Sequence, residues 1–193
     1  MIGAIILAAG SSRRYGDDKR RARLPDGKML IQQTIDTVLD HFESVLLVLR
    51  RDDLTFELEL REIYPQSSLR IFRAPESGLG MGHSLANSMD QVRGWRGVFV
   101  FLADMPRIRG VTIRQLKDSL ETTRIVVPLY QGRYGHPVGF GSVFFDELSA
   151  LEGDRGAKPV IKAHPDCVNG IVSDDPGVLL DVDHPKDLGS GND

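Results

Sequence analysis

The N-terminal segment constrains the fold of this chain more than any other feature. Ile2–Leu7 is an unbroken aliphatic run, and small residues with Gly10 follow it. A strand covered by helices on both faces has this composition, because neither face of such a strand meets water. The run is much shorter than the ~20 apolar residues that cross a bilayer, so we expect no membrane span here. It predicts a buried parallel strand that opens into a loop.

Helix and strand patterns alternate after that run. Apolar residues recur at three- and four-residue spacing over residues 30–42, as on one face of an amphipathic helix. Further helices are predicted at 52–63, 84–92 and 111–120, with two short ones before the last strand; further strands are predicted at 44–49, 69–72, 98–102, 124–129, 138–140 and 167–172. With right-handed crossovers, this order predicts an α/β fold in three layers: a mostly parallel open sheet with helices on both faces.

Length and composition limit the domain organisation. The 193 residues, 41% hydrophobic and 26% charged, suit one globular domain, and we see no repeat or linker. We therefore predict a single domain over residues 1–188 and a flexible tail over residues 189–193. The lone Cys167 cannot form an internal disulfide or a cysteine-rich metal site, which is typical of a reducing compartment and predicts a cytoplasmic location.

The loop after the first strand carries the clearest chemical signal. Ligands of open α/β sheets bind beyond the carboxyl ends of the strands, and residues 8–19 follow directly on such an end. Small residues let backbone N–H groups approach a phosphate, and Arg13, Arg14 and Lys19 could neutralise its oxygens. The loop matches neither the Walker motif nor the dinucleotide fingerprint, and a solvated turn is the alternative.

A dense run of cations in the same region offers a second interpretation, an RNA-binding patch. The six cations are Arg13, Arg14, Lys19, Arg20, Arg21 and Arg23. No series of aromatic residues accompanies them, and the net charge of the chain is −3. A triphosphate fits one crowded loop better than a nucleic acid does, so we expect no nucleic-acid partner.

Two acidic residues and one histidine are further candidates. Asp104 ends a hydrophobic strand, where its carboxylate could hold Mg²⁺ against phosphates or could instead cap the following helix. Asp183 also follows an apolar stretch, although Pro185 nearby fits plain helix initiation. His136 lies between Gly135 and Pro137, which suits contact with a substrate, whereas isolated histidines are often structural.

Six motifs occur in order from about residue 3 to residue 188, and together they resemble the molybdenum cofactor nucleotidyltransferases, above all the cytidylyltransferases and then the guanylyltransferases. They are Leu7-Ala8-Ala9-Gly10-x-Ser12-x-Arg14-x-Gly16-x-x-Lys19, Gly80-Met81-x-x-Ser84-Leu85, Leu102-Ala103-Asp104-Met105-Pro106, Gly135-His136-Pro137-Val138, Gly153-Asp154-x-Gly156-Ala157-Lys158 and Asp181-Val182-Asp183-x-Pro185-x-Asp187-Leu188.

The resemblance implies a Rossmann-like nucleotidyltransferase fold and a Mg²⁺-dependent transfer of a nucleoside monophosphate to a phosphate of molybdopterin, with release of pyrophosphate. It also implies, as partners, a nucleoside triphosphate, a molybdopterin-type acceptor, and a recipient molybdoenzyme or its chaperone. The residues it implicates are Arg14, Lys19 and Asp104 in catalysis; Leu7, Ala8, Ala9, Gly10, Ser12, Arg13, Ser84 and His136 in substrate binding, the last on the acceptor side; and Asp104 and Asp183 in metal binding.

Ala9 bears on the choice of base. Members of the resembled family with Leu-Ala-Ala-Gly in the first loop tend to use CTP, and those with Leu-Ala-Gly-Gly tend to use GTP, so CTP is favoured here. Lys158, His184 and Lys186 depart from the family pattern, which leaves two alternatives open. The acceptor could be a sugar phosphate or another small phosphorylated alcohol, or the chain could be a non-catalytic nucleotide-binding module.

Overall fold

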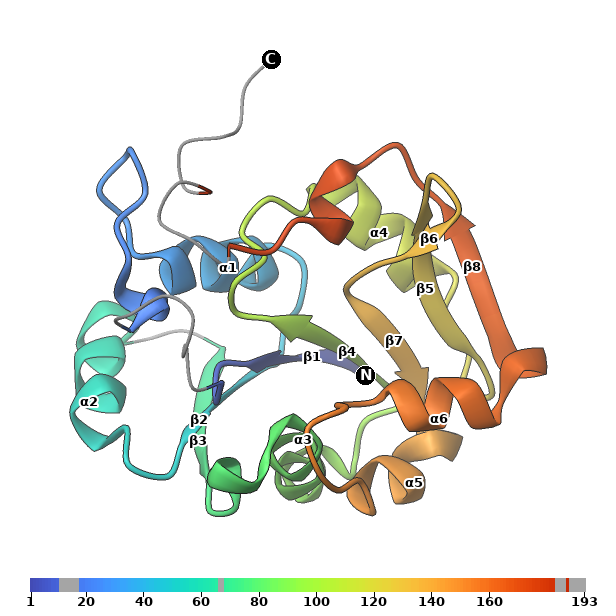
Figure 1. Cartoon of the computed structure of the whole chain (residues 1–193), viewed down its shortest axis with the longest axis horizontal. Coiled ribbons are helices and arrows are strands. Elements are labelled where there is room, and N and C mark those ends of the chain that lie inside the picture. Colours follow the sequence, from blue (N-terminus) through green and yellow to red (C-terminus); the bar gives the residue numbers. More distant parts are fainter. Residues whose placement is uncertain (11–17, 66–67, 183–186, 188–193) are drawn as a thin grey trace.

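One mixed sheet organises the chain in the computed structural model, which describes residues 1–10, 18–65, 68–182 and 187 (Figure 1). Within these residues the sheet has eight strands: β1 (Ile2–Leu7), β2 (Val45–Arg50), β3 (Leu69–Ala74), β4 (Gly97–Leu102), β5 (Ile125–Tyr130), β6 (Arg133–Tyr134), β7 (Val138–Gly141) and β8 (Val168–Val172). Their order is β3-β2-β1-β4-β7-β5-β6, and β8 pairs with β5.

The sheet is parallel except at β7 and at the short strand β6, which pairs antiparallel with β5. Strands β1 to β4 pair in parallel, and so do β5 and β8, whereas β7 runs antiparallel to both β4 and β5. A parallel neighbour needs a long crossover, and the connection from Tyr130 to Val138 is too short for one. The sequence predicted extended structure at 138–140 but not its direction. The predicted fold class is otherwise confirmed.

Two hydrophobic cores lie on opposite faces of the sheet. Because side chains alternate along a strand, Ala4 and Ile6 of β1 enter one core, and Ile5 and Leu7 enter the other. The first core is covered by α1 (Leu30–Leu39), α2 (Leu54–Ile63) and α4 (Gly110–Asp118); the second by α3 (Met81–Met89), α5 (Phe145–Ser149) and α6 (Lys158–Ala163). Figure 1 shows α1 and α4 above the sheet and α3, α5 and α6 below it.

The helix ends differ from the sequence prediction mainly at α3. The predicted helix over 84–92 begins earlier, at Met81, and its last turn, Asp90–Val92, is a 3-10 helix. Gly80 marks the start of α3 with φ of 124°, a backbone conformation that strongly favours glycine. The glycine-rich segment Gly78–Gly82 therefore contains the N-terminus of a helix.

No helix within the described residues is long and apolar enough to cross a membrane.

Candidate functional site

A cavity of about 1060 Å³ opens at the carboxyl ends of β1, β2 and β4. This is the edge at which the open-sheet rule places ligands. Seven residues that the sequence selected line it: Leu7, Ala8, Ala9, Gly10, Lys19, Ser84 and Asp104. The cavity therefore brings together residues that are up to 97 positions apart in the chain.

Hydrogen bonds join the backbone at the end of β1 to both of its neighbours, β2 and the end of β4. The Ala8 N–H donates to the Val48 carbonyl at 2.8 Å, and the Leu7 carbonyl accepts from the Ala103 N–H at 3.1 Å. Ala8 is buried and Gly10 is exposed, so the chain passes from the core to the cavity surface within three residues. A Cβ on Gly10 would meet nothing within 4 Å. The first loop thus starts from a rigid support and has open space in front of it.

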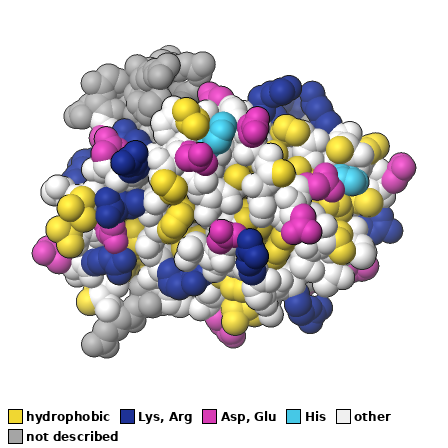
Figure 2. Space-filling model, turned by 90° about the horizontal axis from the view of Figure 1, so that it is seen from below, with side chains coloured by type: hydrophobic (Ala, Val, Ile, Leu, Met, Phe, Trp, Pro, Cys, Tyr) yellow, Lys and Arg dark blue, Asp and Glu magenta, His cyan; other side chains and the backbone are white. Residues whose placement is uncertain are grey.

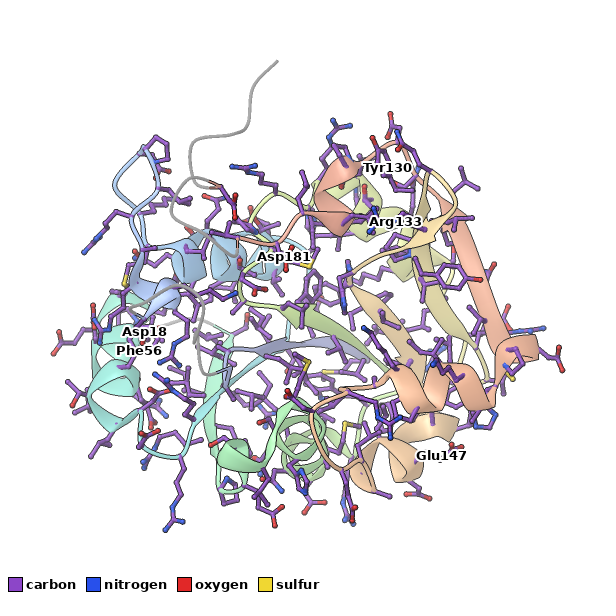
Figure 3. All side chains as sticks on the ribbon, in the orientation of Figure 1. Asp18, Phe56, Tyr130, Arg133, Glu147 and Asp181 are labelled. Carbon is purple, nitrogen blue, oxygen red and sulfur yellow. The ribbon has the colours of Figure 1, made fainter. Side chains whose placement is uncertain are left out.

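Lys19 and Asp104 form the charged centre of the cavity. Lys19 begins a 3-10 turn, Lys19–Arg21, and its Nζ lies 2.5 Å from Asp104 Oδ2 and 3.2 Å from the Val182 carbonyl. Both side chains remain about one-fifth exposed, at 17% and 21%. The Val182 N–H also donates to the Asp104 carbonyl at 2.9 Å. The C-terminal segment therefore docks on the end of β4, and Figure 3 shows Asp181 at this place, above β1 and β4.

The N-terminus of α3 forms the opposite wall, and it packs too closely against residues 153–154 for larger side chains. A Cβ on Gly80 would lie 2.5 Å from the Gly153 carbonyl, which also accepts from the Gly82 N–H at 2.8 Å. Asp154 Oδ1 accepts from the Met81 N–H at 3.2 Å. The Ser84 hydroxyl donates to the Gly80 carbonyl at 3.1 Å, so this residue, which was predicted to bind substrate, stabilises the first turn of α3.

An ion cluster that the sequence did not predict lies behind the loop. Arg20 is only 3% exposed and pairs with Asp18 and Asp53, and Arg50 pairs with the same two carboxylates. Burial alone would raise the pKa of Asp53, but the hydrogen bonds and charges of Arg20 and Arg50 outweigh it and lower this pKa to about 2. Figure 3 shows Asp18 beside Phe56 of α2, whose ring lies 4.7 Å from the Arg20 guanidinium. No local sequence signal distinguishes this arginine from its exposed neighbours.

His136 is not among the residues that line the cavity. The backbone N–H of His136 donates to the Val178 carbonyl at 2.8 Å, and the peptide bond from His136 to Pro137 is cis. Within the described residues, its buried Nδ1 has no hydrogen-bond partner. Burial lowers the pKa of His136, against the opposing effects of a backbone hydrogen bond with Val100 and of nearby acidic side chains. Its predicted place on the acceptor side stays a prediction.

Four of the predicted site residues, Ser12, Arg13, Arg14 and Asp183, lie outside the described residues, as does the predicted tail. Within the part of the chain that is described, no group of three or more His, Cys, Asp or Glu side chains could hold a metal ion. Metal binding by Asp104 and Asp183 therefore stays a prediction. Figure 2 shows basic and acidic side chains interspersed over the face on the side of α3, α5 and α6, without a continuous basic field.

A match to a family model decides the class of protein. Residues 4–168 match the model of the MobA-like NTP transferase domain, which is well over half of the chain. The chain belongs to the MobA-like NTP transferase family. The resemblance drawn from the six motifs is thus confirmed at the level of the family, and the MobA-like chain is a member of a nucleotidyltransferase family.

Proteins similar to this MobA-like chain cover nearly all of it. Purine catabolism protein PucB of Bacillus subtilis is 27% identical over 194 residues, which covers 95% of this chain and 92% of PucB. The structure of Rv0371c from Mycobacterium tuberculosis has a TM-score of 0.80 and 26% identity and covers 96% of this chain and 94% of Rv0371c. Rv0371c has also been solved in complex with manganese.

A third structure shares the fold alone. Molybdopterin-guanine dinucleotide biosynthesis protein A of Archaeoglobus fulgidus has a TM-score of 0.67 and 19% identity, and covers 97% of this chain and 95% of that protein. The predicted Rossmann-like nucleotidyltransferase fold is confirmed by these likenesses.

Proposed function

We propose that this protein transfers a nucleoside monophosphate, from CTP in preference to other triphosphates, to a phosphate of a molybdopterin cofactor. An acceptor phosphate oxygen would form a bond to the α-phosphorus, and the bond from that phosphorus to the bridging oxygen would break, releasing pyrophosphate. The observation that carries the proposal is the meeting of Lys19 and Asp104 in a cavity whose floor is the backbone of residues 7–10. A cation, a carboxylate and small residues at one strand edge suit a polyphosphate.

Lys19 supports this proposal by its position. Its ammonium group lies at the cavity wall, within hydrogen-bond distance of Asp104 Oδ2 and the Val182 carbonyl. A triphosphate in the cavity would place its phosphate oxygens beside this positive charge. The charge that develops on departing pyrophosphate would then lie beside a fixed cation, which stabilises the transition state. We propose the same role for Arg14, and backbone or side-chain contacts to the nucleotide for Ser12 and Arg13.

The carboxylates suit a divalent cation. Mg²⁺ in phosphate-transfer sites usually takes one or two carboxylates and completes its shell with phosphate oxygens and water. Asp104 offers one partly exposed carboxylate at the cavity. We propose Asp183 as the second ligand, because it follows Val182, whose N–H donates to the Asp104 carbonyl. Mg²⁺, when bound, would supply a Lewis acid that draws charge from the phosphates.

Pyrophosphate release tests the proposal directly. Purified protein with Mg²⁺ and molybdopterin cofactor should release pyrophosphate with CTP faster than with GTP, ATP or UTP. Asp104→Asn should fold normally and lose at least about a hundredfold in rate, as expected for loss of a charged group that acts in the transition state. A fully active Asp104→Asn protein contradicts the role of Asp104. Release only with a sugar phosphate as acceptor would keep the chemistry and refute the molybdopterin assignment.

Ala9 gives a separate test of the base preference. Its methyl group would crowd a purine more than a pyrimidine, and discrimination by one methyl group is worth about 1–3 kcal/mol. We therefore expect Ala9→Gly to lower the ratio of kcat/KM for CTP to kcat/KM for GTP by about fivefold to 150-fold. An unchanged ratio would show that other contacts select the base.

A further inference from the structure

Arg20 has every one of its side-chain donors bonded within the protein. Nε donates to Asp18 Oδ1 at 2.8 Å, and Nη2 donates to Asp18 Oδ2 at 2.7 Å and to Asp53 Oδ1 at 2.8 Å. Nη1 donates to Asp53 Oδ2 at 2.5 Å and to the Ala8 carbonyl at 2.8 Å. A guanidinium group has five N–H donors, so none is left for a ligand. Arg20 lines the cavity beside Lys19, its neighbour in the chain, but its guanidinium group is bonded to the protein alone.

The bond to the Ala8 carbonyl fixes a peptide plane at the cavity. In a trans peptide the C=O and the next N–H point in opposite directions, so Arg20 sets the direction of the Ala9 N–H as well. Ala9 lines the cavity, and none of the described residues accepts a hydrogen bond from its N–H. This N–H points away from the guanidinium and is available to a ligand oxygen.

The same guanidinium group joins two parts of the first loop. It holds Ala8 at the start of the loop and Asp18 near its end, and both contacts are buried or partly buried. Asp53, at the start of α2, receives the second pair of bonds and is itself fixed by the Arg50 N–H at 2.9 Å. Arg20 thus connects the loop to the end of β2 through a bidentate pair, a geometry that lysine cannot reproduce.

We propose that Arg20 is a positioning residue for the nucleotide: it orients the Ala8–Ala9 peptide toward its ligand. The proposal rests on the proposed function, because it assumes that a nucleotide fills the cavity. Arg20 touches no reacting atom. Its loss should therefore weaken nucleotide binding in the ground state and the transition state alike, which raises KM and leaves kcat nearly unchanged.

The test compares Arg20→Lys with Arg21→Lys. Arg21 is the matched control because it lies in the same 3-10 turn, is paired with Glu59 and also lies over the Phe56 ring, at 4.4 Å, but its side chain is 40% exposed. Both variants keep their charge. The measurements are KM, kcat and Kd for the nucleotide that wild-type protein uses best.

We expect Arg20→Lys to raise KM and Kd by at least about tenfold and to change kcat less than about threefold. Arg21→Lys should leave all three quantities within about twofold of wild type. An Arg20→Lys protein with wild-type KM, or equal effects from both variants, would overturn the proposal.

A second variant keeps the test decisive if Arg20→Lys does not fold. Asp53→Asn retains Arg20 and removes the charge that holds its Nη atoms, so KM should rise by about threefold with kcat unchanged. An unchanged KM in that variant overturns the role of Arg20. Wild-type protein that binds none of the four nucleoside triphosphates refutes the proposed function itself, whereas binding by wild type with no effect in the variants refutes only the positioning role.

Discussion

The buried carboxylate of Asp53 should make the stability of this protein depend on pH in a way that one substitution removes. Its pKa is about 2 in the folded protein and 3.8 ordinarily, and its side chain is 7% exposed. At about 1.4 kcal/mol per pH unit, this gap corresponds to about 2 kcal/mol of stability at pH 7. Because the folded-state pKa is the lower one, the contribution is complete above about pH 4 and is lost as the pH falls toward 2.

Asp53→Asn should mimic the protonated, uncharged form of the Asp53 side chain at every pH. We expect urea unfolding to show the variant less stable than wild type by about 2 kcal/mol between pH 5 and 7, and by only about 1 kcal/mol at pH 3. Carboxylates outside the cluster of Asp18, Arg20, Arg50 and Asp53 titrate alike in both proteins, so their effects cancel in the difference. Asp52→Asn, an exposed neighbour, is the control and should stay within about 0.5 kcal/mol throughout. If the loss of unfolding free energy in Asp53→Asn is the same at pH 7 and at pH 3, the electrostatic reasoning is refuted.

Two further substitutions test the stability that one closely packed glycine and one buried carboxylate contribute. Gly80→Ala should lower the free energy of unfolding, measured by urea titration, by about 2 kcal/mol or more, because the φ of Gly80 is 124° and the added Cβ would lie 2.5 Å from a carbonyl oxygen. Gly78→Ala is the control: its Cβ would meet nothing within 4 Å, so the free energy of unfolding should change little. Asp175→Ala should cost about 3 kcal/mol or more, since this fully buried carboxylate accepts from the Arg109 and Gly177 N–H groups and from a threonine hydroxyl. Asp174→Ala, 93% exposed, is its control, and equal losses in thermal unfolding would contradict the explanation.

Hydrophobic periodicity was sufficient to predict most of the fold, because burial on one or two faces leaves a regular pattern. The aliphatic run of β1 matches its predicted bounds, and α1 begins at the predicted Leu30. The pattern could not give the direction of β7, which depends on the short connection through the cis His136–Pro137 bond. It also could not place the start of α3 at Met81, which depends on packing of Gly80 against residue 153. The second of these features arises from a contact between distant segments.

Some residues of the candidate site could likewise be predicted from the sequence, and others could not. Ala9 and Asp104 could be predicted to face one cavity because each follows a strand of a parallel sheet, and the topology brings those strand ends together. The six cations between positions 13 and 23 look alike in the sequence, yet Lys19 pairs with Asp104 in the cavity, Arg20 is buried against two carboxylates, and Arg21 stays partly exposed. What separates them is Asp53, at the start of α2, which supplies the buried carboxylate that Arg20 needs. A cation in a phosphate loop can therefore act on the ligand or on the loop itself, and only the position of its acidic partner determines which.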